Sequence, residues 1–247
     1  MGDAEQPSAR APYENAICLT FDVDWAPDAV IDELVDELQA AGVRATLFAT
    51  HATPSLQTIS DDALEIGLHP NFNECGGNYA EPLRLVRDAY PDATGARSHS
   101  LMVSSRILDL YANSGLRYES NVFLPLHPHL RPVLRFEGMV SIPFWWTDDV
   151  HFTRTPDFAL SSLPLDQRGL KVFTFHPIHV FMNTSSADQY LRFKPHYSDA
   201  AKLRPLRNAG EGTGTLLDQL LTHIAQTGIQ TWTMADIAAS FTSAVTI

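Results

Sequence analysis

Strand-like and helix-like segments alternate along this chain from residue 16 onward, and this alternation limits the folds it can adopt. The runs suited to strands are 16–22, 43–49, 64–68, 95–99, 116–123, 170–175 and 229–232. The amphipathic helical patterns are 27–41, 81–89, 104–115, 216–226 and a last one from about 234. Such alternation within one domain is typical of a β/α barrel or a doubly wound sheet. The strand number and the length of 247 residues favour the barrel, so we predict an α/β fold, a single distorted (β/α)7-type barrel.

Two parts of the chain do not follow this pattern. Residues 1–15 are polar, contain two prolines and have no apolar centre of a signal peptide, so we expect a flexible leader before a single domain over 16–247. The segment 124–170 is irregular and rich in proline and aromatic residues. Within it, Glu137-Gly138 predicts the turn of a hairpin between 133–136 and 139–142.

The charge balance excludes several classes of partner. The net charge of −12 offers no basic surface to nucleic acid or to an anionic membrane. No apolar run approaches the roughly 18–20 residues of a membrane span. The two cysteines do not form a disulfide framework. We therefore expect a cytoplasmic protein with no membrane insertion and no nucleic-acid partner.

Two carboxylates, Asp22 and Asp24, follow the first predicted strand. Residues two apart on a strand point to the same face, so both side chains should share one small space at its carboxyl end. Parallel α/β folds keep their reactive groups there. An aspartate after a strand is often a helix cap, but Pro27 already marks the start of the next helix. Two close carboxylates repel each other unless a cation or an arginine neutralises them, and we predict a metal site at this pair.

Further reactive side chains also stand where predicted strands end. In a β/α barrel all these ends share one rim, so residues far apart in sequence converge on one pocket. Each residue alone has an ordinary structural explanation, and only the joint pattern predicts a site. These residues are His69, Arg97, His99, Asn121, Asp148, Asp149, His176 and His179.

These residues together resemble the polysaccharide deacetylase superfamily, carbohydrate esterase family 4. Thr20-Phe21-Asp22-Val23-Asp24 is similar to the family motif Thr-Phe-Asp-Asp with one residue inserted. The resemblance implies that Asp22 is the catalytic base and Asp24 a metal ligand. It also implies that Arg97 holds the base and that His176, in a motif similar to Leu-x-His, is the catalytic acid.

The segment around Trp145 and Trp146 is similar to the family motif that forms one wall of the groove and orients the catalytic histidine. By this resemblance Asp149, with Asp148 as the alternative, orients His176. The segments 124–170 and 190–207 are expected to shape the groove. The residues predicted to bind substrate are Trp145, Trp146, Asn71, Asn121 and His179.

The chain departs from the family in its second motif, His-Ser/Thr-x-x-x-His, which supplies two metal ligands. His69 is present, but the position four residues later is Asn73. An amide oxygen is a poor partner for zinc beside imidazole and carboxylate. His99, one strand along the rim, is the predicted replacement, which gives an Asp24/His69/His99 site. The alternatives are Asn73 or Asn71 as the third ligand, or no tightly bound metal.

The resemblance implies a hydrolase with one divalent ion, zinc by preference, that removes an acetyl or formyl group from the nitrogen of an amino sugar or glycan. The sequences His69-Pro70-Asn71-Phe72 and Phe175-His176-Pro177-Ile178-His179 resemble a divergent branch associated with bacterial surface-glycan (O-antigen) biosynthesis. Three alternatives stay open: a metal-dependent amidase acting on a small non-sugar amide, a glycoside hydrolase with two carboxylates, and a catalytically inactive sugar-binding homologue. The sequence does not indicate the sugar, its carrier or the oligomeric state.

Overall fold

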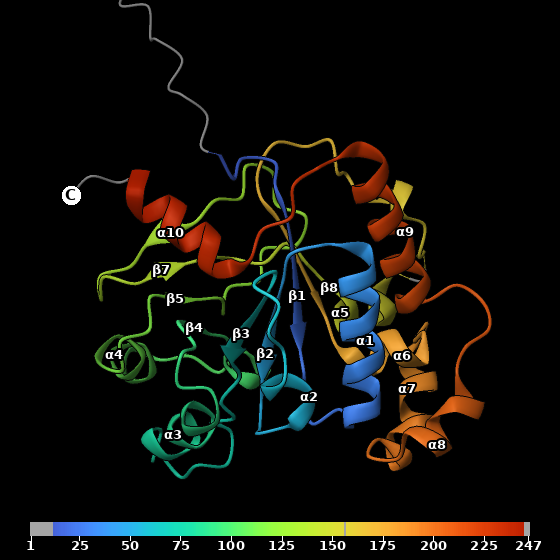
Figure 1. Ribbon diagram of the computed structural model, residues 1–247, viewed down its shortest axis with the longest axis horizontal. Coiled ribbons are helices and arrows are strands. Elements are labelled where there is room, and N and C mark those ends of the chain that lie inside the picture. Colours follow the sequence, from blue (N-terminus) through green and yellow to red (C-terminus); the bar gives the residue numbers. More distant parts are fainter. Residues whose placement is uncertain (1–11, 156, 245–247) are drawn as a thin grey trace, which may run out of the picture.

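A computed structural model describes residues 12–155 and 157–244 and contains one nine-stranded sheet (Figure 1). Its strands are β1 (Ile17–Asp22), β2 (Ala45–Ala49), β3 (Leu64–Leu68), β4 (Gly95–Ala96), β5 (Tyr118–Glu119), β6 (Val133–Leu134), β7 (Val140–Ser141), β8 (Trp146–Thr147) and β9 (Lys171–Phe175). Their order is β6-β7-β5-β4-β3-β2-β1-β9-β8. Neighbouring strands are parallel except in the hairpin of β6 and β7, which lies where the turn at Glu137-Gly138 predicts it.

The sheet curls into a distorted barrel because one extended segment, 140–147, pairs with strands on both sides. At its start β7 pairs with β5, in its middle Phe144 forms a bridge with Phe123, and at its end β8 pairs with β9. The backbone N–H of Phe144 donates to Val122, whereas that of Trp145 donates to Val172. The wall of the barrel therefore consists of β1 to β5, the segment 140–147 and β9. This confirms the predicted fold class.

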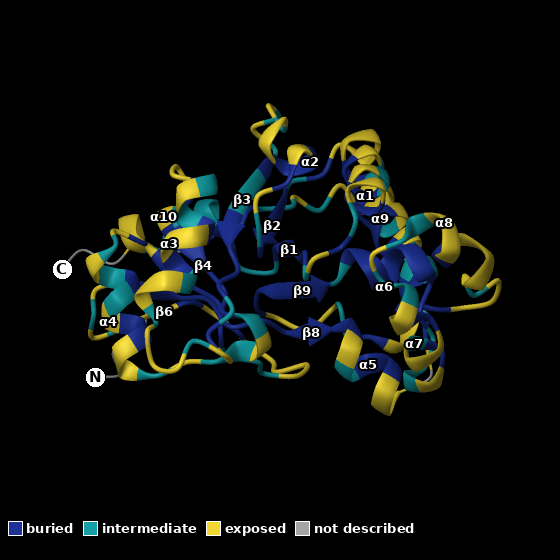
Figure 2. Cartoon of the chain, turned by 90° about the horizontal axis from the view of Figure 1, so that it is seen from below, coloured by how far each residue is buried: buried dark blue, intermediate teal, exposed yellow. Residues whose placement is uncertain are grey.

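The helices form an outer layer whose apolar faces pack on the sheet. They are α1 (Asp28–Ala41), α2 (Pro54–Gln57), α3 (Ala80–Ala89), α4 (Ser105–Asn113), α5 (Asp148–Arg154), α6 (Pro177–Met182), α7 (Ala187–Phe193), α8 (Ala200–Leu203), α9 (Thr213–Thr227) and α10 (Met234–Ala244). Short 3-10 turns are η1 (His99–Leu101), η2 (Leu160–Ser162), η3 (Lys194–His196) and η4 (Arg204–Leu206). Helices α1, α6 and α9 lie together, and the exposed residues gather on the outer sides of the helices (Figure 2). No helix in the described ranges is long and apolar enough to cross a membrane.

Helix α1 illustrates how the sequence sets these elements. Its buried residues recur every three or four positions from Val30 to Leu38, as one face of a helix requires. It ends where Gly42 adopts a left-handed conformation, with φ of 63°. The strand β1 is buried along its whole length because β2 and β9 flank it and helices cover the sheet.

Several predicted boundaries differ from the structure. The strand predicted at 95–99 ends at Ala96, so His99 lies in the turn η1 rather than on a strand. The strand predicted at 116–123 shortens to β5, and 229–232 contributes only a bridge between Ile17 and Thr231. Of the predicted leader, residues 1–11 lie outside the described residues. Residues 12–15 form a turn in which Tyr13 is buried, so the described fold begins before residue 16.

Candidate active site

A cavity of about 520 Å³ opens at the carboxyl ends of the strands, where the sequence predicts the site. Residues that follow β1, β3, β4, β8 and β9 meet in it, as the shared rim of a barrel requires. Its titratable lining residues are Asp22, Asp24, His69, His99, Asp149, Arg154, His176, His179, Tyr190 and Tyr197.

Asp24 lies at the centre of a cluster of imidazoles. Its Oδ1 is 2.8 Å from Nδ1 of His99 and 3.2 Å from Nε2 of His69. Its Oδ2 is 3.6 Å from Nε2 of His176. Burial acts to raise the pKa of Asp24, but the hydrogen bonds with His69 and His99 outweigh it and hold that pKa well below its usual range. The carboxylate is therefore charged.

The same cluster has the donor set of a metal site. The ligand atoms of Asp24, His69 and His99 lie within 4.8 Å of one another. One carboxylate and two imidazoles suit zinc and related divalent ions. The residues present thus fit a divalent cation.

Asp22 is held by a buried arginine. Nη1 of Arg97, which is fully buried, donates to Asp22 Oδ1 at 2.8 Å. Nε of Arg97 donates to the carbonyl of Ser120 at 2.9 Å. The guanidinium carbon also lies 4.5 and 4.9 Å from the ring centres of Phe48 and Phe144. These contacts fix the Asp22 carboxylate beside the Asp24 cluster.

His176 is held by Asp148, which the resemblance gave as the alternative, and not by Asp149, the residue that the resemblance favoured. Asp148 is fully buried, and its two oxygens accept from Nδ1 and from the backbone N–H of His176, both at 2.7 Å. Asp149 instead accepts from the Thr147 hydroxyl and the Val150 N–H, at the start of α5. Burial acts to lower the pKa of His176, but the charge of Asp148 and its hydrogen bond outweigh it, and that pKa is raised well above its usual value.

Comparison with known proteins shows the family of the chain. The sequence model of the WbmS-like polysaccharide deacetylase family matches residues 19–194. The chain belongs to this polysaccharide deacetylase family. No curated protein matches the chain.

Solved structures place this chain among relatives of the same fold. WbmS from Bordetella bronchiseptica, described provisionally as a polysaccharide deacetylase involved in O-antigen biosynthesis, is 36% identical with a TM-score of 0.79, over 84% of this chain and 90% of that one. The Bc1960 peptidoglycan N-acetylglucosamine deacetylase is 13% identical with a TM-score of 0.53, over 92% and 90%. A mutant of BA3943, a family 4 pseudoenzyme with restored activity, is 14% identical with a TM-score of 0.54, over 92% and 68%. The last two show the fold alone.

The two tryptophans predicted to line the groove lie in the core of the protein. Trp145 and Trp146 are 1% and 4% exposed, and neither lines the cavity. Both rings pack against Phe173 of β9, since β8 pairs with that strand. The aromatic lining comes instead from the segments 124–170 and 190–207 and their neighbours, through Phe123, Phe144, Phe152, Tyr190 and Tyr197.

The two asparagines predicted to bind substrate have structural contacts and do not line the cavity. Asn71 Oδ1 accepts from the backbone and side-chain amides of Asn73 at 3.0 and 2.9 Å, so these two residues bond each other instead of completing the metal site. Asn121 is buried, accepts from the Ser98 N–H and donates to Glu119. Its side chain therefore connects the chain segments that follow β4 and β5.

His179 does line the cavity, one helical turn after His176. Its Nδ1 lies 3.1 Å from the Thr184 hydroxyl, and its ring centre is 5.4 Å from that of His176. Burial, followed by the charge of His176, holds the pKa of His179 well below its usual value. Tyr190 and Tyr197 were not predicted individually, because the turns of 190–207 carry no periodic signal that fixes which side chains point inward.

Proposed function

We propose that this chain is a metal-dependent hydrolase that removes an N-acyl group, acetyl or formyl, from an amino sugar of a glycan. The observation that carries the proposal is the convergence of three sets of side chains in one cavity. They are the Asp24/His69/His99 cluster, Asp22 held by Arg97, and His176 held by Asp148. Membership of the polysaccharide deacetylase family supports a glycan substrate.

Asp24, His69 and His99 would hold the divalent ion, with zinc preferred by this donor set. Such an ion polarises an amide carbonyl and lowers the pKa of bound water. In this proposal His99 takes the place of the missing second-motif histidine, and the proximity of Asp24, His69 and His99 supports an active enzyme over an inactive sugar-binding homologue.

Asp22 is the general base in this proposal. Arg97 fixes its carboxylate through a hydrogen bond from a fully buried guanidinium. Asp22 takes a proton from the water molecule that attacks the amide carbon. The buried guanidinium cannot swing away, since Ser120 and the rings of Phe48 and Phe144 hold it.

His176 is the general acid. Asp148 keeps its ring oriented with Nδ1 toward the carboxylate, so Nε2 faces the Asp24 cluster and the cavity. The raised pKa of His176 keeps the ring protonated until the C–N bond breaks. The Nε2 proton then passes to the departing amine, and the products are a carboxylate and a free amino sugar.

The relative described as an O-antigen biosynthesis protein supports a bacterial surface glycan as the substrate. A cytoplasmic location stays a prediction from the sequence. The alternative function, hydrolysis of a small non-sugar amide, would use the same residues. A screen that compares N-acetyl and N-formyl sugars with small amides, and measures the acetate or formate released, separates the two substrate classes.

The proposal is tested by the metal content of protein purified without chelators, measured by inductively coupled plasma mass spectrometry. We expect about one zinc or similar ion per chain in the wild type and its loss in His99→Ala. Asn73→Ala is the matched control and should keep its metal. Absence of metal from the wild type even after zinc is supplied, or full activity of Asp22→Asn, contradicts the proposal.

A further inference from the structure

Arg154, the last residue of α5, lines the candidate cavity and carries a positive charge at every ordinary pH. No other arginine or lysine is among the described residues that line this cavity, and Arg154 forms no ion pair with a described carboxylate. The carboxylates of the cavity have other partners. Asp22 bonds Arg97, Asp24 bonds two imidazoles, and Asp149 accepts from groups at the start of α5. The cavity of a chain with a net charge of −12 thus keeps one cation without a counter-charge among the described residues.

His179 of α6 adds a hydrogen-bond donor to this cavity. The residue is 6% exposed, and its one hydrogen bond within the described residues joins Nδ1 to the Thr184 hydroxyl at 3.1 Å. Thr184 is fully buried, and its hydroxyl has no other partner in that part of the chain. The hydroxyl therefore donates to Nδ1, because a buried donor without an acceptor is costly. Nδ1 is then the acceptor, and Nε2 carries the proton of the neutral ring.

Nε2 of His179 is left without a described partner, on a nearly buried side chain that lines the cavity. Buried polar groups normally have a hydrogen-bond partner, so this N–H indicates a ligand that accepts. The same wall carries Arg154: the ring of Phe152 packs edge-to-face on His179 at 4.8 Å, and Phe152 stands two residues before Arg154 on α5. A neutral acceptor would satisfy His179 alone, whereas an anion would also balance the charge of Arg154.

We propose that the substrate carries an anionic group, a carboxylate or a phosphate, in addition to its N-acyl group, and that Arg154 and His179 bind this group. Both anions suit arginine, since its planar guanidinium donates two parallel hydrogen bonds to either of them. The proposal rests on the proposed function. It narrows the substrate class from amino sugars in general to negatively charged ones.

The competing explanation is that Arg154 is an ordinary surface arginine and that a bound metal ion attracts any charged sugar. Arg154→Gln removes the charge, and Arg154→Lys keeps it. Arg192→Gln is the matched control, because Arg192 is exposed on α7, does not line the cavity and also has no described ion pair. His179→Phe keeps a ring that can pack on Phe152 but removes the N–H.

The experiment uses zinc-loaded full-length protein at neutral pH, with affinity measured by calorimetry and acetate release measured in parallel. The probes are N-acetylglucosamine, which is neutral, N-acetylglucosaminuronic acid, which has a carboxylate, and N-acetylglucosamine-1-phosphate. The wild type should bind at least one charged probe about tenfold more tightly than the neutral one, and the probe that shows this gain identifies the anion. Arg154→Gln should lose the gain and His179→Phe should reduce it about threefold. Arg154→Lys and Arg192→Gln should keep it, and all four variants should retain zinc.

Equal affinity of the wild type for the three probes overturns the proposal, as does the absence of binding of both charged probes. A gain that survives in Arg154→Gln overturns it, since the metal then accounts for the attraction. An equal loss in Arg192→Gln, an undiminished gain in His179→Phe, or loss of zinc from Arg154→Gln does so as well. The proposed function fails separately: preference for a charged probe without acetate release upholds the anion site and contradicts the hydrolase. Acetate release without that preference does the reverse.

Discussion

Asp148 is the neighbour that raises the pKa of His176 most. Asp148 is fully buried and contacts His176 through both carboxylate oxygens, whereas Asp149, the next residue, does not contact the ring. Burial raises the pKa of Asp148, and the charge and hydrogen bonds of His176 offset only part of this increase. A general acid must be protonated at the working pH, so this pairing decides the pH range in which the proposed hydrolase works.

Asp148→Asn should therefore lower kcat by about 100-fold near neutral pH. A histidine whose pKa is raised keeps its proton below that pKa and loses it as the pH rises through it. The amide removes the charge that raises the pKa of His176, so the fall in activity at high pH should begin at a lower pH. The measurement is a pH profile of kcat. Asp149→Asn is the matched control, and an equal shift in both variants contradicts the assignment of Asp148.

Sequence and structure agree on Asp24 for different reasons. Strand alternation predicts that Asp22 and Asp24 share a space, and they do, but β1 ends at Asp22. The left-handed backbone at Asp24 brings its side chain inward. Alternation is a property of a regular strand. The left-handed backbone conformation of Asp24 and Trp25, after β1 has ended, cannot be predicted from the residue types.

At the scale of elements, long regular segments could be predicted closely, and among the short ones the hairpin of β6 and β7 could be predicted from its turn residues whereas the bounds of β4 and β5 could not. The predicted strand over 64–68 and the stop of α1 at Gly42 agree with the structure, because burial periodicity and a helix-ending glycine are local signals. The strands β4 and β5 have only two residues each, since side chains such as Asn121 take over the hydrogen bonding beyond them. Such tertiary contacts leave no local pattern.

The pairing of β4 with β5 depends on one such tertiary contact. Gly95 lies opposite Tyr118, whose ring crosses the glycine so closely that an added Cβ would stand 2.0 Å from it. Tyr118 is fully buried and its hydroxyl donates to Glu65, so the ring has no free place to move to.

Gly95→Ala should therefore lower the free energy of unfolding by about 1–3 kcal/mol through overpacking, measured by urea denaturation. Gly210→Ala is the control, because an added Cβ there meets no atom closer than 3.6 Å. Its effect should stay within about 0.5 kcal/mol. Equal stability of the two variants means that Tyr118 can rearrange and that β4 and β5 are held by other contacts.

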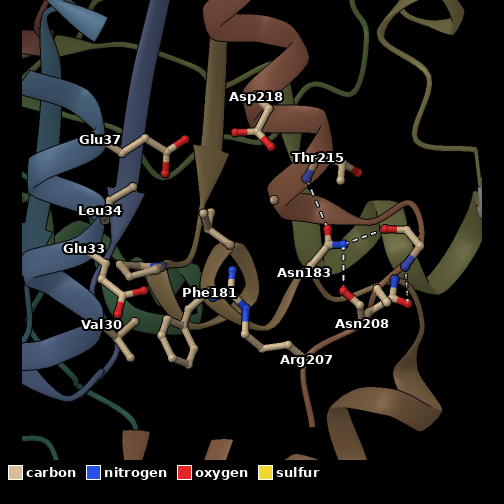
Figure 3. A pocket seen from close by; sticks show the side chains of 15 residues that line it. Val30, Glu33, Leu34, Glu37, Phe181, Asn183, Arg207, Asn208, Thr215 and Asp218 are labelled. Carbon is tan, nitrogen blue, oxygen red and sulfur yellow. Dashed lines mark hydrogen bonds between the residues drawn. The ribbon is translucent and has the colours of Figure 1, made fainter. Parts of the chain in front are cut away.

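At the scale of the whole molecule, carboxylates outnumber basic groups, with a net charge of −12, and some carboxylates lie close to one another. The clearest case lies away from the candidate site, in a cavity of about 290 Å³ between α1, α6 and α9 (Figure 3). Glu37 of α1 and Asp218 of α9 face each other there and share a side-chain hydrogen bond, with Arg207 nearby. Burial, followed by the charge of Asp218, raises the pKa of Glu37 to about 7.

This pair makes the stability of the fold depend on pH. The pKa of Glu37 is about 7 in the folded chain against an ordinary value of 4.5, so the folded state holds the shared proton more tightly than the unfolded state. Its stabilising effect is complete below about pH 4.5 and is lost as the pH rises through 7. Because Glu37 is partly exposed, solvent screening reduces the effect to about 1 kcal/mol.

Glu37→Gln keeps a hydrogen bond to Asp218 without needing the proton. The variant should be more stable than the wild type at pH 8 by about 1 kcal/mol and should differ little from it at pH 5. Urea denaturation at the two pH values is the measurement. Glu33→Gln is the matched control, since Glu33 lies on the same helix and cavity but pairs with Arg204. The assignment is contradicted if Glu37→Gln gains no stability at pH 8 or if Glu33→Gln gains as much. In either case the loss of stability at high pH comes from the net charge of the molecule and not from this pair.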